Sequence, residues 1–168
     1  MVVDSFVKDG KNVMVKRDLR FVDSFRFMAS SLDALSKNLG SDECMNMNKF
    51  YKGEQFELLR KKGVYPYEWT NIERLSDGEL PPKAFYSKLN ECGISDEDYT
   101  HAQNVWSSFK CKTFTDYHDL YNVSDVLLLA DIFENLRSVC LQTSKLDPAW
   151  YYTSPGLSWD AMLKMTKI

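Results

Sequence analysis

The sequence predicts a helix-rich α/β domain in which a short β-rich start is followed by helices. Strand-forming residues are concentrated before position 26, where the Asp9-Gly10 pair is typical of a hairpin turn. Beyond that point apolar residues recur at intervals of three and four, which is the period of an α-helix. We therefore expect a hairpin and one further strand, followed by about five or six helices.

The N-terminal strands are predicted from their side chains and from the turn between them. Residues 2–7 and 12–15 flank the Asp9-Gly10 turn, and residues 19–25 form a third segment rich in β-forming residues.

Capping residues and apolar spacing predict the helices that follow. Ser30 or Ser31 caps a first helix, whose apolar face includes Leu32 and Leu35 and which Gly40 ends. The remaining helices are expected at about residues 48–62, ended by Gly63, and at 83–90, 95–108 and 115–144, with a further helix beginning after Pro148. Ser95, with Asp98 three residues later, predicts a capping box at the start of the helix 95–108. In the long helix the core-facing residues are expected to be Leu120, Val123, Leu127, Phe133, Leu136 and Cys140.

Composition argues against several classes of protein. A net charge of −3 argues against binding to nucleic acid through bulk positive charge, although a local basic strip is compatible with it. Four cysteines without a C-x-x-C pair and only two histidines argue against zinc, and their scatter is typical of reduced thiols inside a cell. The longest apolar run, residues 126–130, is too short to cross a bilayer, and early charges interrupt any signal-peptide pattern. We expect a soluble, intracellular protein with no membrane partner.

Tyr121 and Asp125 are the residues best placed for chemistry. They lie one helical turn apart, so a phenol and a carboxylate project from the same face, and His118 shares that stripe. Cleavage of a phosphodiester by two metal ions needs carboxylates and a group that orients the attacking water. The open alternative is an exposed helix face above an apolar core.

Residues 116–134, which contain this pair, resemble the third exonuclease motif of family B DNA polymerases. In that family a Tyr and an Asp four residues later bind the water and a catalytic metal. The resemblance implies that Tyr121 holds the water and that Asp125 binds Mg²⁺ or Mn²⁺.

Residues 19–28 and 30–35 are similar to the strand and helix that follow the second exonuclease motif in protein-primed polymerases of viruses and Polinton-like transposons. The residues at three positions of that pattern contact single-stranded DNA and the terminal protein, and here Ser24, Phe25 and Met28 take those places. Phe25 departs from the usual Leu. It could stack on a base, or it could belong to the core.

Lys61, Lys62 and the five residues after them resemble a lysine motif that lies near the third motif in this family. Lys61 with Val64 fits the spacing of the motif, whereas Lys62 is offset by one. The resemblance implies a catalytic ammonium from Lys61 near the scissile phosphate and a DNA contact from Lys62. The open alternative is a basic helix C-terminus favoured by the helix dipole.

The resemblance covers nearly the whole chain. Residues 1–147 are similar to the C-terminal part of a 3′–5′ exonuclease domain, and residues 148–168 to the connector towards a polymerase domain. The implied fold is an incomplete ribonuclease H-like exonuclease fold. The implied partners are single-stranded DNA or a primer terminus, a terminal protein and the remainder of a polymerase, with a nuclear or virus-associated location.

The two earlier carboxylate motifs of such an exonuclease, and the motifs of a polymerase palm, are not found in the sequence. The only Asp-x-Glu, Asp77-Gly78-Glu79, lies just before Pro81 and predicts a turn. A magnesium site needs more carboxylates than Asp125 alone. We therefore expect this chain to bind no metal firmly and to be inactive by itself.

Three functional hypotheses remain. The chain is a fragment of a DNA-directed DNA polymerase that replicates and proofreads, or a non-catalytic module derived from one that binds nucleic acid or protein. The third hypothesis is a helical interaction protein of unrelated origin. Under this hypothesis the family order of the motifs is a coincidence.

Overall fold

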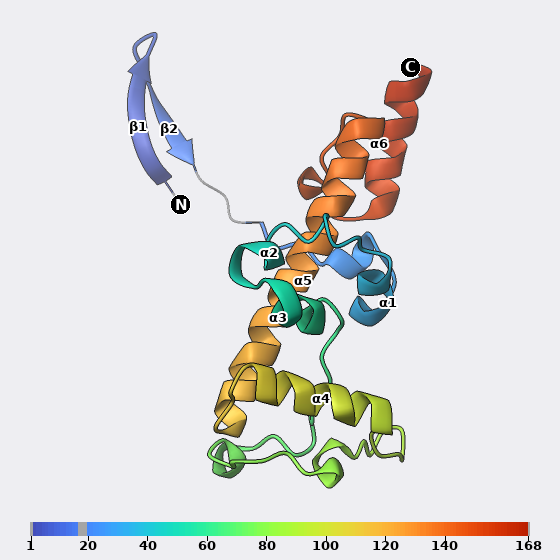
Figure 1. Cartoon of the computed structure of the whole chain (residues 1–168). Helices are drawn as coiled ribbons and strands as arrows, with labels where there is room; N and C mark the ends of the chain where they lie inside the picture. The colour runs from blue at the N-terminus through green and yellow to red at the C-terminus, as the bar shows by residue number, and fades with distance from the viewer. Residues whose placement is uncertain (1, 17–19, 168) are drawn as a thin grey trace.

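The computed structural model describes residues 2–16 and 20–167 and consists mainly of helices (Figure 1). Helices make up 54% of the chain, and the described residues contain one two-stranded antiparallel sheet, so the helix-rich class is confirmed. None of the described helices combines the length and apolar character that a bilayer crossing requires.

The elements follow one another along the chain as hairpin, short helices and long helices. The strands are β1 (Val2–Lys8) and β2 (Lys11–Lys16). The α-helices are α1 (Leu32–Lys37), α2 (Met47–Phe50), α3 (Gly53–Leu59), α4 (Asp96–Ser108), α5 (Phe114–Thr143) and α6 (Ser154–Thr166). Short 3₁₀ turns are η1 (Ser24–Arg26), η2 (Ile72–Arg74), η3 (Pro82–Phe85) and η4 (Pro148–Trp150).

The N-terminal hairpin is confirmed. Its strands pair from Lys8 opposite Lys11 outwards, and Asp9 and Gly10 have φ of 51° and 72°. Two consecutive positive φ values are what a tight hairpin turn needs to match the twist of its strands. In Figure 1 the hairpin stands apart from the helical body.

The predicted third strand is wrong for the residues that the structure describes. Residues 20–23 are irregular, and Ser24–Arg26 forms the η1 turn. The Asp23 carboxylate accepts a hydrogen bond from the Phe25 amide at 3.0 Å, which favours a turn over a strand. Leu19, where the predicted strand would begin, lies outside the described residues.

The capping signals predicted two helix starts correctly, and the long helix α5 begins at Phe114, close to the predicted residue 115. Ser31, rather than Ser30, caps α1, and Ser95 caps α4, with its Oγ accepting from the Asp98 amide at 3.1 Å. Thr113 and Asp116 form a reciprocal capping box at the start of α5.

Two predicted helices differ from the structure. The segment 48–62 is divided into α2 and α3, because Lys52 is extended and Gly53 has a φ of 55°. The segment 83–90 contains only the η3 turn, since the chain reverses where Ser87 pairs with Cys92.

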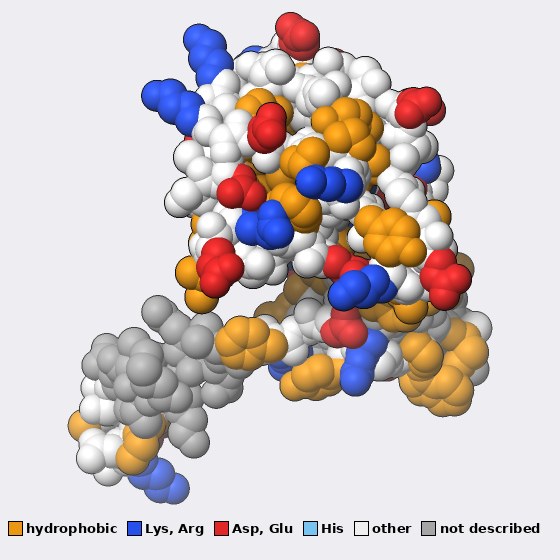
Figure 2. All heavy atoms as spheres, turned by 90° about the horizontal axis from the view of Figure 1, so that it is seen from below, with side chains coloured by type: hydrophobic (Ala, Val, Ile, Leu, Met, Phe, Trp, Pro, Cys, Tyr) orange, Lys and Arg blue, Asp and Glu red, His pale blue; other side chains and the backbone are white. Residues whose placement is uncertain are grey.

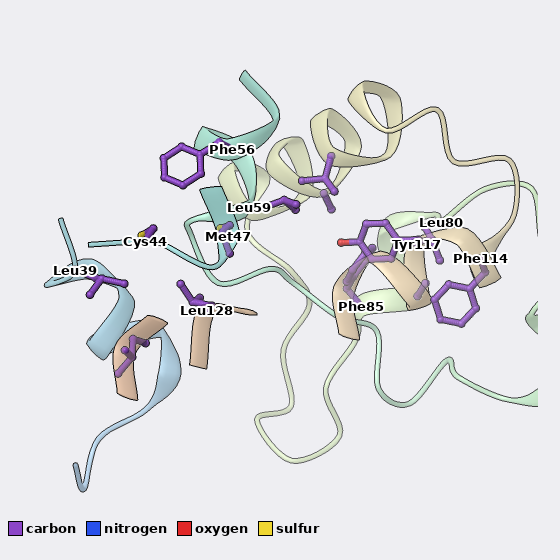
Figure 3. Packing of buried hydrophobic residues seen from close by; sticks show 14 residues of the cluster. Leu39, Cys44, Met47, Phe56, Leu59, Leu80, Phe85, Phe114, Tyr117 and Leu128 are labelled. Carbon is purple, nitrogen blue, oxygen red and sulfur yellow. The ribbon is translucent and has the colours of Figure 1, made fainter. Parts of the chain in front are cut away.

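The core follows one stripe of α5, and in the first half of the helix that stripe lies one position after the predicted one. The other predicted core residues, Phe133, Leu136 and Cys140, are partly buried. The buried residues of α5 recur at intervals of three and four as far as Asp131, which Ile132 follows directly: Phe114, Tyr117, Tyr121, Ser124, Leu128, Asp131 and Ile132. Val123, which was expected in the core, is 47% exposed, whereas Leu120 and Leu127 are partly buried and pack against the edge of the core. The cluster runs from Leu39 and Met47 at one end to Phe85 and Phe114 at the other (Figure 3).

Asp131 is a fully buried carboxylate in this core. It is 0% exposed and accepts hydrogen bonds from the backbone amides of Asn46, at 2.6 Å, and Met47, at 3.0 Å. Those amides begin α2, so the Asp131 side chain of α5 supplies the acceptor that the start of α2 lacks.

Arg137 and Asp147 join the end of α5 to η4. The Arg137 guanidinium donates to both carboxylate oxygens of Asp147, at 2.9 and 2.6 Å. The guanidinium, together with the Ala149 amide that Asp147 also accepts, holds the pKa of this carboxyl below its ordinary value. The N-terminal segment is attached nearby, since Arg20 donates to the Trp150 carbonyl at 2.7 Å and lies over the Tyr152 ring.

Replacing Asp131 with Ala is expected to lower the free energy of unfolding by about 2 to 4 kcal/mol, because two buried amides lose their acceptor. Urea unfolding monitored by far-UV circular dichroism measures this loss. Asp119→Ala, an exposed change on the same helix, is the control. An Asp131→Ala protein as stable as the control would contradict the assigned role.

Asp147→Asn is expected to destabilise the protein at neutral pH and to lose this effect in acid. A carboxyl whose folded pKa lies below its unfolded value of about 4 contributes stability above that value and loses it as the pH falls through the folded pKa. Unfolding free energies of both proteins, measured from neutral pH down to strong acid, should therefore converge. A pH-independent difference would contradict the Arg137–Asp147 interaction as its source.

Candidate functional site

Lys62, Tyr121 and Asp125 meet at the middle of α5. The Lys62 ammonium donates to the Tyr121 hydroxyl and to Asp125 Oδ2, both at 2.6 Å. The lysine lies in the segment that follows α3. This segment contacts α5, since the Tyr117 hydroxyl donates to the Val64 carbonyl at 2.6 Å and Gly63 lies against the Tyr121 ring. Both charged side chains are 24% exposed, so the pair lies at the surface of the core and is reachable from solvent.

The Tyr121 side chain is enclosed on several sides and is only 8% exposed. The Tyr65 ring lies 4.5 Å away between centroids, and the Tyr67 hydroxyl is 2.7 Å from that of Tyr121. Gly63 passes so close that an added Cβ would lie 3.1 Å from the ring. Its lack of a side chain therefore serves close packing, whereas the helix that it was predicted to end stops at Leu59.

This enclosure further disfavours the phenolate form of Tyr121. Burial raises the pKa of the phenol far above its ordinary value, and the Tyr67 hydrogen bond and the Asp125 charge add to the effect. Tyr121 therefore keeps its proton at physiological pH. It can orient a water molecule or a phosphate oxygen by hydrogen bonding, but it does not act as a phenolate.

A second hydrogen-bond chain supports the Tyr65 ring. The Tyr65 hydroxyl lies 2.5 Å from His118 Nδ1, and His118 Nε2 lies 2.9 Å from the Asn122 carboxamide. Thr70 Oγ1 lies 3.0 Å from the same hydroxyl. These hydrogen bonds hold the Tyr65 ring against Tyr121. His118 contacts Tyr65, which lies between it and the Tyr121 ring.

An open pocket of about 540 Å³ adjoins the Tyr121 ring. Its walls come from α1, from residues 61–67 and from the start of α4. Each carboxylate that lines it is paired with a lysine: Asp33 with Lys37 at 2.7 Å, and Glu97 and Asp98 with Lys61 at 3.6 and 3.8 Å. Asp125, beside the pocket, is paired with Lys62 in the same way.

This charge pattern does not fit a divalent metal. Among the described residues no group of three or more His, Cys, Asp or Glu side chains is arranged to hold an ion. Asp125 offers one carboxylate, and the ammonium of Lys62 already occupies one of its oxygens. The residues present do not form a magnesium site by themselves.

The structure brings together some of the predicted site residues and separates others. Tyr121, Asp125 and Lys62 are in direct contact, whereas Lys61 lines the same pocket and pairs with α4. The lysine beside the Tyr–Asp pair is thus Lys62, and Lys61 is not in contact with that pair. The exposed-face alternative is wrong for Tyr121, which belongs to the core.

Ser24, Phe25 and Met28 do not line the pocket beside Tyr121. Phe25 is 59% exposed, so the alternative that it belongs to the core is wrong. Met28 packs against α1 and the second half of α5.

Tyr65 and Tyr67 were not among the site residues predicted from the sequence. Both lie in the segment that follows the two lysines, and both contact Tyr121. The Tyr-Pro-Tyr sequence shortly after the lysines was the available signal, because it places two phenols near them on a backbone that the proline restricts. In the structure the two rings lie 5.0 Å apart between centroids.

The surface around α4 carries interspersed charges. Figure 2, which views the molecule from that end, shows acidic and basic side chains mixed among hydrophobic ones, without a broad basic area on that face. Any contact of this face with nucleic acid would therefore be local.

No family model, curated protein or solved structure matches this chain.

Lys62→Met is expected to lower the free energy of unfolding by about 1 to 3 kcal/mol, because Asp125 loses its partly buried cation and Tyr121 loses a donor. The matched control is Lys61→Met, which breaks only exposed pairs and should cost less than about 1 kcal/mol. Chemical unfolding of both variants distinguishes them. Equal losses would contradict the assignment of Lys62 to the site.

Proposed function

We propose that this chain is the C-terminal part of the 3′–5′ exonuclease domain of a protein-primed family B DNA polymerase. In this proposal the chain is an incomplete ribonuclease H-like exonuclease fold, and α6 belongs to the connector towards the polymerase domain. Its substrate is single-stranded DNA at a primer terminus, and its macromolecular partners are a terminal protein and the remainder of the polymerase.

The contact among Lys62, Tyr121 and Asp125 carries this proposal. Tyr121 and Asp125 lie one turn apart on α5, and both accept a hydrogen bond from the Lys62 ammonium. Lys62 precedes them in the chain by 59 and 63 residues. Tyr121 is protonated and can hold a water molecule, and Lys62 can contact a phosphate oxygen. These are the roles that the third exonuclease motif and the neighbouring lysine have in the family that the sequence resembles.

The proposed chemistry is shared with segments outside this chain. Asp125 is a single carboxylate already paired with Lys62, so the other metal ligands must come from the two earlier motifs of the parent domain. What this chain supplies is the position of Tyr121, the carboxylate of Asp125 and one wall of the DNA site. By itself it is inactive.

A non-catalytic module that binds nucleic acid or protein is the second candidate. The pairing of every carboxylate in and beside the pocket with a lysine favours it, because that arrangement is complete without a metal. The two candidates differ in whether activity appears when the missing carboxylates are restored.

Complementation with the front half of such an exonuclease domain tests the proposal. We expect this chain alone to leave a thymidine oligonucleotide intact with Mg²⁺ or Mn²⁺. Mixed with a front half that carries the two earlier motifs, it should digest that oligonucleotide. Asp125→Ala and Tyr121→Phe should abolish the digestion, whereas Lys61→Ala should retain most of it.

Binding at low salt separates the remaining outcomes. Weak, salt-sensitive binding of the oligonucleotide that falls in Lys62→Ala and Phe25→Ala, without complementation, would favour the non-catalytic module. Digestion by this chain alone would overturn its assigned inactivity. Absence of both binding and complementation would overturn the nucleic-acid role.

A further inference from the structure

A second pocket, of about 440 Å³, lies between the loop of residues 78–85 and α4. None of the residues that contact Tyr121 lines it. The pocket therefore shares no lining residue with the pocket beside Tyr121, and a ligand bound here would not depend on the proposed exonuclease function.

The walls of this pocket are aromatic and fixed in position. The Tyr99 hydroxyl donates to the Leu80 carbonyl at 3.0 Å, and the Phe85 ring meets that of Tyr99 edge-on at 6.1 Å. Trp106 is stacked on Tyr117 at 5.9 Å between centroids. Aromatic surfaces held in this way need no rearrangement before a ligand binds.

The polar lining of the pocket contains one negative charge and several neutral groups. Glu79 is the one charged side chain among the described residues of the lining, and within the described parts of the chain it forms no ion pair or hydrogen bond. The Gln103 and Asn104 carboxamides also line the pocket and make no hydrogen bond to any described residue. A carboxylate, two free carboxamides and aromatic walls favour a ligand that is cationic and rich in hydrogen-bond donors.

Two cations near this loop, Arg74 of η2 and Lys83 of η3, are directed elsewhere. Arg74 lies over the Trp69 ring at 3.5 Å and Lys83 lies over it at 5.9 Å, and neither lines the pocket. The chain therefore does not neutralise Glu79 with these cations.

We propose that this pocket binds the arginine side chain of a partner polypeptide. A guanidinium is planar and weakly hydrated, so it can stack on an indole while donating in a fork to a carboxylate and to carboxamide oxygens. An ammonium would offer a more strongly hydrated point charge with less to gain from the aromatic wall. A nucleotide is disfavoured, since its phosphates would face Glu79 in a lining that has no cation among the described residues.

Nuclear magnetic resonance of the full chain tests this proposal. The probe is a capped glycine–arginine–glycine tripeptide, and its matched control carries citrulline, which keeps the shape and removes the charge. The observable is the indole N–H resonance of Trp106, assigned by its loss in Trp106→Phe. We expect saturable shifts with the arginine peptide and much weaker ones with the citrulline peptide.

Two variants test whether the Glu79 carboxylate binds the arginine peptide. Glu79→Gln should weaken binding of the arginine peptide about tenfold, while Glu54→Gln, which removes the same charge from the exposed start of α3, should leave it unchanged. Equal binding of both peptides, or no shift of Trp106 at millimolar peptide, would overturn the proposal. Tighter binding of free agmatine than of the peptide would overturn the assignment to a polypeptide partner.

Discussion

The hydrogen bonds from the backbone of Asn46 and Met47 to the Asp131 carboxylate fix the elements that build the candidate site. They attach the start of α2 to α5 inside the core, where an unpaired carboxylate or amide would be costly. α3 follows directly, and the segment that leaves α3 carries Lys62 to Tyr121. The position of the lysine thus depends on a polar contact about two turns beyond Asp125 on α5.

Carboxylates around the candidate site are neutralised by lysines. Lysines pair with the carboxylates in and beside the Tyr121 pocket, and the net effect is a surface of mixed sign. Arg74 and Lys83 lie over Trp69 instead, and Glu79 has no partner within the described residues. The two pockets consequently differ in electrostatics although they share one core.

Local signals in the sequence predicted the local features well, because a cap or a turn depends on neighbouring residues. Ser31, Ser95 and the Asp9-Gly10 turn are examples. The burial pattern of α5 was harder to predict, since Ser124 and Asp131 interrupt its apolar stripe and are buried through hydrogen bonds that involve other segments or the helix itself. Likewise, the four-residue spacing predicted that Tyr121 and Asp125 share a helix face. Which of Lys61 and Lys62 contacts them depends on the direction in which the chain leaves α3.

The Lys62–Asp125 contact also bears on how the protein responds to its ionic environment. Its partners are 63 residues apart, so it forms only after a long loop has closed, whereas the capping box of α5 forms within four residues. A partly folded chain can therefore contain α5 with a bare Asp125 carboxylate. Because both side chains of this pair are reachable from solvent, added salt screens their attraction and weakens the contact that closes the loop onto α5.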